Sequence, residues 1–234
     1  MIKPIEILKP NILEDALLFD LQGEDFSLNQ GRKNTVSGGF RAVFEAPVKV
    51  SRMLIKNTDI LNIQIGVKTS AEAADFTPFA DFDLVKSGRD ILLSFSAPAE
   101  ACAFEFSFTG AESSENVFFY NFILTDSILL LDKALSSFTP SGYLRGGYHY
   151  TAGGTLITWK EFSKNSGSLV LENLPAALKQ KLESLCDENV FLTFIFYGSY
   201  DLSQSGEYAL TSPLKAELSR SGGLWTLRLE ITEK

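Results

Sequence analysis

The second half of the chain contains one segment with helical periodicity among segments with strand periodicity. The segment is LENLPAALKQKLESLCDENVFLTFIFYG, residues 171–198, and its apolar stripe is Leu174, Leu178, Leu182 and Leu185. Spacings of three and four residues predict an amphipathic helix, which we place at 174–188. Asn173 is the expected N-cap, with Pro175 in the first turn. The apolar run VFLTFIFY follows at once, so we expect the helix to pack one face on a sheet.

The first half alternates with the period of β-strands. NIQIGVKTS (62–70) and CAFEFSFTG (102–110) place apolar side chains on one face and polar ones on the other. VFFYNFILTD (117–126) is apolar on both faces, which predicts a central strand. FRAVFEAPVKVSRMLIK (40–56) predicts two strands joined by a turn at Ala46-Pro47. ILEDALLFDLQG (12–23) fits a short helix or a strand equally well.

The second half predicts three strands, the helix and three more strands. The last strand, LWTLRLEIT, alternates with Trp225, Leu227, Leu229 and Ile231 facing inward. Residues 128–142, which contain Ser136, Ser137, Pro140 and Gly142, are interpreted as a connector. The glycine-rich YLRGGYHYTAGGTLIT (143–158) predicts a hairpin. The chain is therefore expected to be mainly β, with an antiparallel β-sandwich at 1–127 and an α+β domain of antiparallel strands with one packed helix at 128–234.

Composition narrows the classes of function. The 19 Phe residues favour sheets, and 45% hydrophobic residues allow a large core. A net charge of −8, from 21 basic and 29 acidic side chains, disfavours binding to nucleic acid or to anionic lipid. No segment has the length of a signal peptide or a membrane helix. Cys102 and Cys186 lie in apolar patterns, so we expect two buried free thiols and folding in a reducing cytoplasm.

The candidate catalytic residues are few. His149 is the single histidine, which argues against a zinc site or a Ser-His-Asp triad. Phosphate-binding and dinucleotide-binding loops and a nucleophile elbow are absent from the sequence. Asp75, Asp81 and Asp83 could supply a glycosidase carboxylate pair, but their alternation with Phe is typical of a solvated loop. A calcium site near Asp59 or in 75–83 lacks the ligand spacing of a known loop. We therefore expect no enzyme activity, no cofactor and no metal.

The first half resembles a known family of sandwich modules. VSGGFRAVFEAPVKVSRMLIKNTDILNIQIGVKTS (36–70) resembles the discoidin, or galactose-binding-like, β-sandwich, a jelly-roll fold. The resemblance covers about residues 10–127 and implies the fold without any ligand residue. Exposed Trp or Tyr side chains usually stack on bound sugars, and this half has no Trp and one Tyr, Tyr120. This scarcity weakens the alternative function, recognition of a carbohydrate or host surface, without removing it.

The second half is similar to tail components of bacteriophages and related injection machines. The pattern covers about 143–234: SLVLENL, the helix, VFLTFIFYG, EYALTSPLKAELSR and LWTLRLEITEK. This similarity implies a structural subunit of a virion tail or baseplate, made in the bacterial cytoplasm, that assembles as a ring-like homo-oligomer and with other tail proteins. Such subunits pair hairpins and sheet edges. The expected assembly residues lie in the hairpin: Tyr143, Arg145, Tyr148, His149 and Tyr150.

Overall fold

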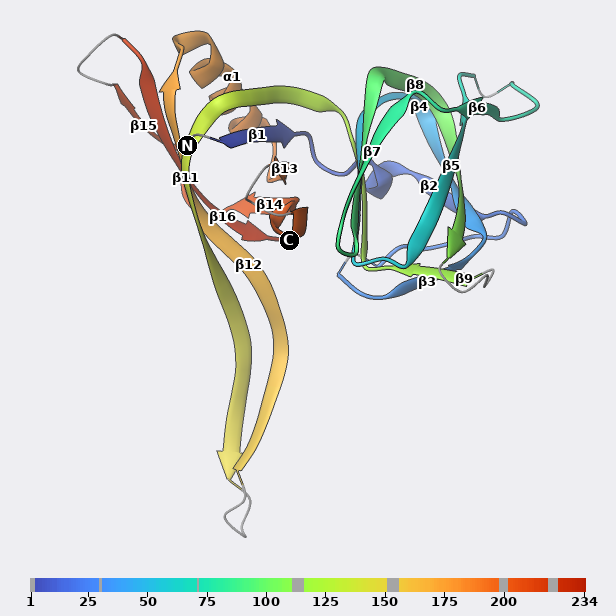
Figure 1. The fold of residues 1–234 in the computed structure, drawn as a ribbon, viewed down its shortest axis with the longest axis horizontal. Coiled ribbons are helices and arrows are strands. Elements are labelled where there is room, and N and C mark those ends of the chain that lie inside the picture. Colours follow the sequence, from blue (N-terminus) through green and yellow to red (C-terminus); the bar gives the residue numbers. More distant parts are fainter. Residues whose placement is uncertain are drawn as a thin grey trace. The chain divides into compact units, whose positions relative to one another are not determined.

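The structure is a computed structural model that describes residues 3–29, 31–70, 72–110, 116–150, 156–197, 202–218 and 223–234. Of residues 3–4, 127–138, 140–150 and 156–164 it describes the backbone alone. The fold is mainly β, with antiparallel sheets and one α-helix among the described residues, as predicted. The chain divides into a sandwich unit, 8–129 with 202–205, and a hairpin unit, 3–7 with 130–197 and 206–234 (Figure 1).

The unit boundaries differ from the predicted domains 1–127 and 128–234. Strand β1 (Lys3–Leu8) joins the sheet of the hairpin unit, and 202–205 belongs to the sandwich unit. Both differences have one cause. A strand or a short turn is held by partners that are distant in sequence, and a local pattern does not identify those partners.

The sandwich unit contains short 3-10 helices and strands β2 to β10. Their bounds are η1 (Ile12–Asp15), β2 (Leu17–Asp20), β3 (Asn34–Ser37), β4 (Gly39–Lys56), β5 (Ile60–Lys68), β6 (Thr77–Phe79), β7 (Phe82–Ser87), β8 (Asp90–Gly110), β9 (Asn116–Phe119), β10 (Asn121–Thr125) and η2 (Leu202–Gln204). The segment 12–23 thus forms both candidates, a helical turn followed by a strand.

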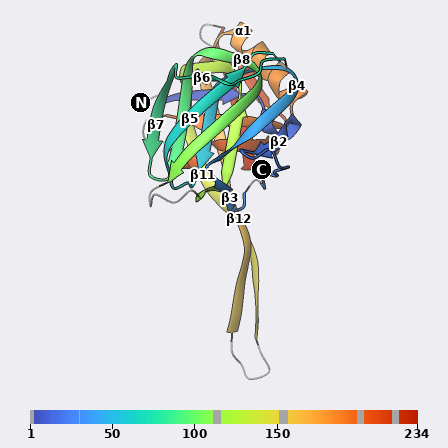
Figure 2. The same ribbon diagram turned by 90° about the vertical axis from the view of Figure 1, so that its right-hand side faces the viewer.

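Two long strands, β4 and β8, connect the layers of the sandwich. Their first layer includes β2, paired with the start of β4, and β5, paired with the end of β8. Their second layer includes β10, paired with the end of β4, and β7, paired with the start of β8. The β4–β8 register breaks between Val43 and Val48 and again between Val50 and Arg52. Such irregularities bend a strand, so one sheet supplies both layers (Figure 2).

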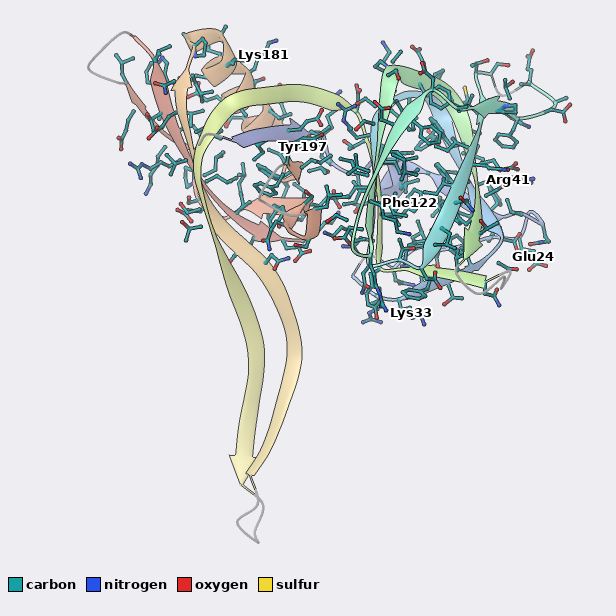
Figure 3. The ribbon with its side chains drawn as sticks, viewed as in Figure 1. Glu24, Lys33, Arg41, Phe122, Lys181 and Tyr197 are labelled. Carbon is teal, nitrogen blue, oxygen red and sulfur yellow. The ribbon has the colours of Figure 1, made fainter. Side chains whose placement is uncertain are left out.

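Phenylalanine rings fill the space between the layers. Phe40 in the first layer lies 5.1 Å, between ring centroids, from Phe122 in the second, and Phe106 lies at the same distance from Phe122. All three are buried, and Figure 3 shows Phe122 among the side chains of this core. Edge-to-face and tilted ring pairs add about 0.5–1.5 kcal/mol each to the area they bury. This core explains the phenylalanine-rich composition.

The hairpin unit contains β1, helix α1 and strands β11 to β16. The bounds are β11 (Ser127–Tyr150), β12 (Leu156–Leu174), α1 (Ala176–Glu188), β13 (Phe191–Phe196), β14 (Gly206–Leu210), β15 (Lys215–Leu218) and β16 (Trp225–Glu233). The strand order is β12-β11-β1-β13-β14-β16-β15, and β16 also pairs with β12. The pairing therefore closes into a ring of strands.

The alternation of β16 is confirmed. Leu227, Leu229 and Ile231 are buried, whereas Arg228 and Glu230 are exposed. Leu169 and Leu171 of β12 lie opposite Leu229 and Leu227 in the register, as expected for cross-strand pairs of one apolar face. Phe194 contacts Tyr208 edge to face, with centroids 5.7 Å apart. Burial raises the pKa of the Tyr208 phenol, and the Glu233 carboxylate raises it further.

The helix predicted at 174–188 is confirmed at Ala176–Glu188. Leu182 and Leu185 are buried, whereas Leu178 is half-buried and Ala177 is exposed. The prediction of Asn173 as N-cap was wrong. Its φ of 60° places it in the left-handed region, and Pro175 is the N-cap without a side-chain hydrogen bond. Asn tolerates that conformation in a turn, which accounts for its presence just before the helix.

Three other local predictions were wrong. Ala46-Pro47 is not a turn, because the chain stays extended through β4 and bends there. Pro47 lies in the break of the β4–β8 pairing, where its missing N–H costs no ladder bond. Residues 128–142 belong to β11 rather than to a connector. VFFYNFILTD, which was predicted to be one central strand, forms β9 and β10 in different sheets. β10 stands at the end of the strand order β10-β4-β8-β5-β6.

Candidate functional site

The hairpin predicted at Tyr143–Thr158 is present and is much longer than the sequence suggested. β11 and β12 pair antiparallel from Leu135↔Leu171 to Tyr150↔Leu156. The pairing of β12 with β16 begins at Ser166↔Thr232, and the backbone N–H of Asn165 donates to Glu233 Oε2 at 3.0 Å. We call 142–150 with 156–165 the outer ribbon. It extends beyond the other strands of its unit (Figure 1), by roughly 30 Å at 3.3 Å per residue.

The predicted assembly residues all lie in the outer ribbon, at defined register positions of β11. Tyr143 is opposite Lys164, Arg145 opposite Phe162, Tyr148 opposite Thr158, His149 opposite Ile157 and Tyr150 opposite Leu156. A register shift lies between Arg145 and Gly146. A bulge of this kind increases the local twist and moves later residues of one strand to the opposite face. After the shift, Trp159 lies opposite Gly147 in the register.

The outer ribbon has two properties that are typical of an interface, an architecture of low intrinsic stability and an aromatic composition. A two-stranded ribbon is marginally stable at best in water, and a third strand or a packed partner is needed for independent stability. Aromatic residues and Arg are enriched at protein interfaces. The aromatic residues of this short element are Tyr143, Tyr148, Tyr150, Trp159 and Phe162. The outer ribbon therefore combines a two-stranded architecture with aromatic residues and Arg145.

A second feature of the hairpin unit is a groove beside the end of α1. It has a volume of about 510 Å³ and is lined by Glu183, Cys186 and Asp187 of α1 and by 210–214, which connects β14 to β15. Leu210 and Leu214 are half-buried and supply apolar surface, while Asp187 is exposed. We call this feature the acidic groove. The sequence analysis missed it, because its two sides meet through β16, which contacts α1 and pairs with β14.

The electrostatics of the acidic groove are dominated by carboxylates. The last turn of α1 has no basic residue, and the negative end of a helix dipole disfavours carboxylates there. Glu183 pairs with Lys179, with a nitrogen–oxygen distance of 2.5 Å. In the part of the chain that the structure describes, Asp187 has no hydrogen-bond or ion-pair partner. Burial raises the pKa of the Cys186 thiol to about 11, and Asp187 and Glu183 add to the shift.

The sandwich unit has an open pocket beside η1 and β2. Its volume is about 550 Å³, and its lining includes Glu14, Leu17, Phe19, Asp25 and Phe26. Leu17 is 64% exposed, so the rim offers apolar surface next to two carboxylates. Its volume lies within the roughly 300–1,000 Å³ that is typical of small-molecule sites. No sequence motif had indicated it.

The carboxylates weighed for catalysis or calcium binding do not converge. Asp75, Asp81 and Asp83 are all exposed, as predicted. The prediction of a loop was wrong for Asp83, which lies in β7, and β6 lies between Asp75 and Asp81. Asp59 Oδ1 accepts the backbone N–H of Phe118 at 2.7 Å and so holds β9 in place. Across the described residues there is no group of three or more His, Cys, Asp or Glu side chains that could hold a metal ion.

The two cysteines are free thiols, as expected. Cys102 is buried, with Sγ 3.6 Å from the carbonyl oxygen of Thr69, whereas Cys186 is half-buried and lines the acidic groove. The expectation that both would be buried therefore holds for Cys102 alone. No helix in the described part of the chain is long and apolar enough to span a membrane.

Comparison of the chain with protein-family models, with curated proteins and with solved structures found no match. The site must therefore be interpreted from its own geometry, whose main feature is the outer ribbon.

Proposed function

We propose that this protein is a non-enzymatic structural subunit that assembles through its hairpin, as part of a bacteriophage tail, a baseplate or a related injection machine. The observation that carries the proposal is the outer ribbon, an aromatic two-stranded element with no third strand in the described chain. An exposed ribbon offers unpaired backbone groups along both edges, and such edges join to other chains unless they are protected. Association of copies or of tail proteins would supply that protection.

The assignment to a tail machine is supported by the order of elements in the hairpin unit. A strand ending in Asn173-Leu174 leads into α1, an apolar strand and a closing strand with Trp225 at its start. This order is the one for which the second half is similar to tail components. Genes for tail tubes, tape measures or baseplates beside the gene for this chain would favour the assignment over one to a polysaccharide-binding system.

Shortening the hairpin tests assembly. In the full chain, 143–164 is replaced by Asn-Gly, a two-residue hairpin turn, between Gly142 and Asn165, which are paired in the register. The mass in solution is measured by light scattering over a range of concentrations, and particle shape by electron microscopy. We expect rings or larger assemblies for the unaltered chain and monomers for the shortened one, both with folded circular dichroism spectra.

The control for this experiment removes exposed apolar surface elsewhere. Leu84 and Val85 of β7 are 45% and 50% exposed, and their replacement by Ser should leave the assembly mass unchanged. A monomeric unaltered chain, or a shortened chain with the same number of copies per particle as the unaltered one, would refute the proposal.

A second candidate function, recognition of a host-surface glycan by the sandwich unit, is favoured by the pocket beside η1. Glu14 and Asp25 could accept hydrogen bonds from sugar hydroxyls, and Phe19 and Phe26 could contact an apolar ring face. Glycan-array binding by the full chain, lost on Glu14→Ala with Asp25→Ala, would support this function. Absence of binding across a broad array would count against it.

A further inference from the structure

We propose that the acidic groove is the docking site for the outer ribbon of a second copy of this chain. The inference rests on the proposed function, assembly through the hairpin, and adds the surface that receives it. The groove offers two carboxylates from α1 at one side, Asp187 and the Lys179-paired Glu183. The apolar side chains of Leu210 and Leu214 lie at the other side. A ligand that fits it must combine positive charge with apolar surface.

The outer ribbon has this combination of charge and apolar surface. Residues 142–165 carry three basic side chains, Arg145, Lys160 and Lys164, and one acidic side chain, Glu161. Their net charge of +2 stands out in a chain whose net charge is −8. The same segment contains five of the aromatic residues of the second half. Complementary charge at an interface steers association and sets register more than it adds affinity, so the ribbon and the groove are suited to each other.

The C-terminal end of α1 has carboxylates but no basic residue in its last turn. Carboxylates at the C-terminal end of a helix are unfavourable by about 0.3–1 kcal/mol each, unless positive charge offsets them. Asp187 and Glu188 both lie there, without a basic residue in the last turn. Ser184 donates to Glu188 at 2.6 Å, which satisfies one oxygen but supplies no charge. Arg145, Lys160 or Lys164 of a docked ribbon would supply it.

The occupant must be another copy, because the ribbon of the same chain does not reach the groove. Within the hairpin unit, α1 and the far end of β11 lie at opposite ends in both views (Figures 1 and 2). A contact between different surfaces of two copies is heterologous, and heterologous contacts close into rings or continue as filaments. The proposed contact therefore generates the ring-like or helical order expected of a tail component.

Exchange of charges between the two surfaces tests the contact. The groove variant carries Glu183→Gln and Asp187→Lys, and the ribbon variant carries Arg145→Glu, Lys160→Glu and Lys164→Glu, all in the full chain. Each variant alone should associate at least about tenfold more weakly than the unaltered chain, because like charges then face each other. Mixing the two variants pairs opposite charges at both kinds of contact, so we expect assembly to return.

The matched control places the same kinds of change outside the groove. Glu217 and Glu230 are exposed on β15 and β16 and do not line it, so Glu217→Gln with Glu230→Lys should assemble normally. Circular dichroism verifies that every variant is folded. Undiminished assembly of the groove variant, or no recovery on mixing, would overturn the docking site. Loss of assembly in the shortened chain at the same time would leave the proposed function in place, whereas a monomeric unaltered chain would refute both.

Discussion

Lys56 and Asp90 form a buried ion pair in the sandwich unit, with Lys56 Nζ 3.0 Å from Asp90 Oδ2 and each side chain 11% exposed. Lys56 Nζ also donates to the carbonyl oxygen of Leu202, at 2.6 Å and 146 residues away in sequence. The other carboxylate oxygen of Asp90 accepts the backbone N–H of Asn57 at 2.8 Å. Asn57 has a φ of 48°, a conformation that this hydrogen bond helps to hold. The pair thus links β4, β8 and the segment 202–205.

Replacement of Lys56 by Met should destabilise the sandwich unit by about 3–5 kcal/mol, because the Asp90 carboxylate would remain buried without its partner. The free energy of unfolding in urea measures the change. Lys49→Met is the matched control, since Lys49 lies 3.7 Å from Glu100 with both side chains about 60% exposed. Exposed pairs contribute about 0–1 kcal/mol. Equal losses for Lys56→Met and Lys49→Met would show that the buried pair has no special role.

Gly39 should not tolerate alanine. An added Cβ would lie 1.9 Å from the carbonyl oxygen of Phe106, and its φ of 150° is one that side chains rarely adopt. We expect Gly39→Ala to cost at least about 3 kcal/mol of stability, from backbone strain together with overpacking. Gly88→Ala is the control, because Gly88 has a φ of 58° and no atom lies within 4 Å of an added Cβ. Its loss of stability measures the cost of a positive φ without a steric clash, about 1–2 kcal/mol. Thermal unfolding of both variants separates the two effects, and similar melting temperatures would contradict the close approach.

Truncation of Leu182 should lower the stability of the hairpin unit more than truncation of any other residue of α1. It is fully buried, so Leu182→Ala is expected to lower the stability of the hairpin unit by about 2–5 kcal/mol through lost burial and a cavity. Lys181, next in the chain and exposed, is labelled on α1 in Figure 3. Its replacement by Ala should change stability by less than about 0.5 kcal/mol. Two variants that unfold at the same urea concentration would mean that α1 does not pack through this face.

Strands with one buried face were predictable, and their partners were not. Alternation in 62–70 and 102–110 identified parts of β5 and β8, because Ile63, Ile65 and Phe106 face a core while their neighbours face solvent. The break at Pro47 was misinterpreted because proline marks a turn and a gap in strand pairing equally well. Only the pairing of β4 with β8 distinguishes the two.

The candidate site was predictable in part for the same reason. Tyrosines among glycines indicated a hairpin at 143–158, since turn residues and alternating apolar residues are local signals. The reach of the hairpin depends on where β16 stops pairing, at Ser166↔Thr232. The acidic groove lies between α1 and 210–214, which are brought together because β16 contacts α1 and pairs with β14. Neither property can be inferred from a local pattern, because both depend on contacts between distant segments.

Cys186 should react slowly with alkylating reagents at ordinary pH. Burial, with Asp187 and Glu183, raises the pKa of this thiol from 9.0 to about 11. Because the thiolate is the nucleophile, at pH 8 the thiol has roughly a hundredfold less thiolate than one with pKa 9.0. The rate of iodoacetamide labelling should therefore keep rising with pH up to about 11.

The shortened chain with Cys102→Ser isolates this rate, because it lacks the ribbon proposed to dock in the groove and Cys186 is then its one cysteine. Asp187→Asn removes one of the charges that oppose ionisation, so labelling at pH 8 should become several-fold faster. It should stay slower than in denaturant, because burial is the largest cause of the shift. A rate at pH 8 equal to that of the denatured chain, or one that Asp187→Asn leaves unchanged, would contradict the negative potential inferred for the groove. Slower labelling in the unshortened chain would show that the outer ribbon covers Cys186 when copies associate.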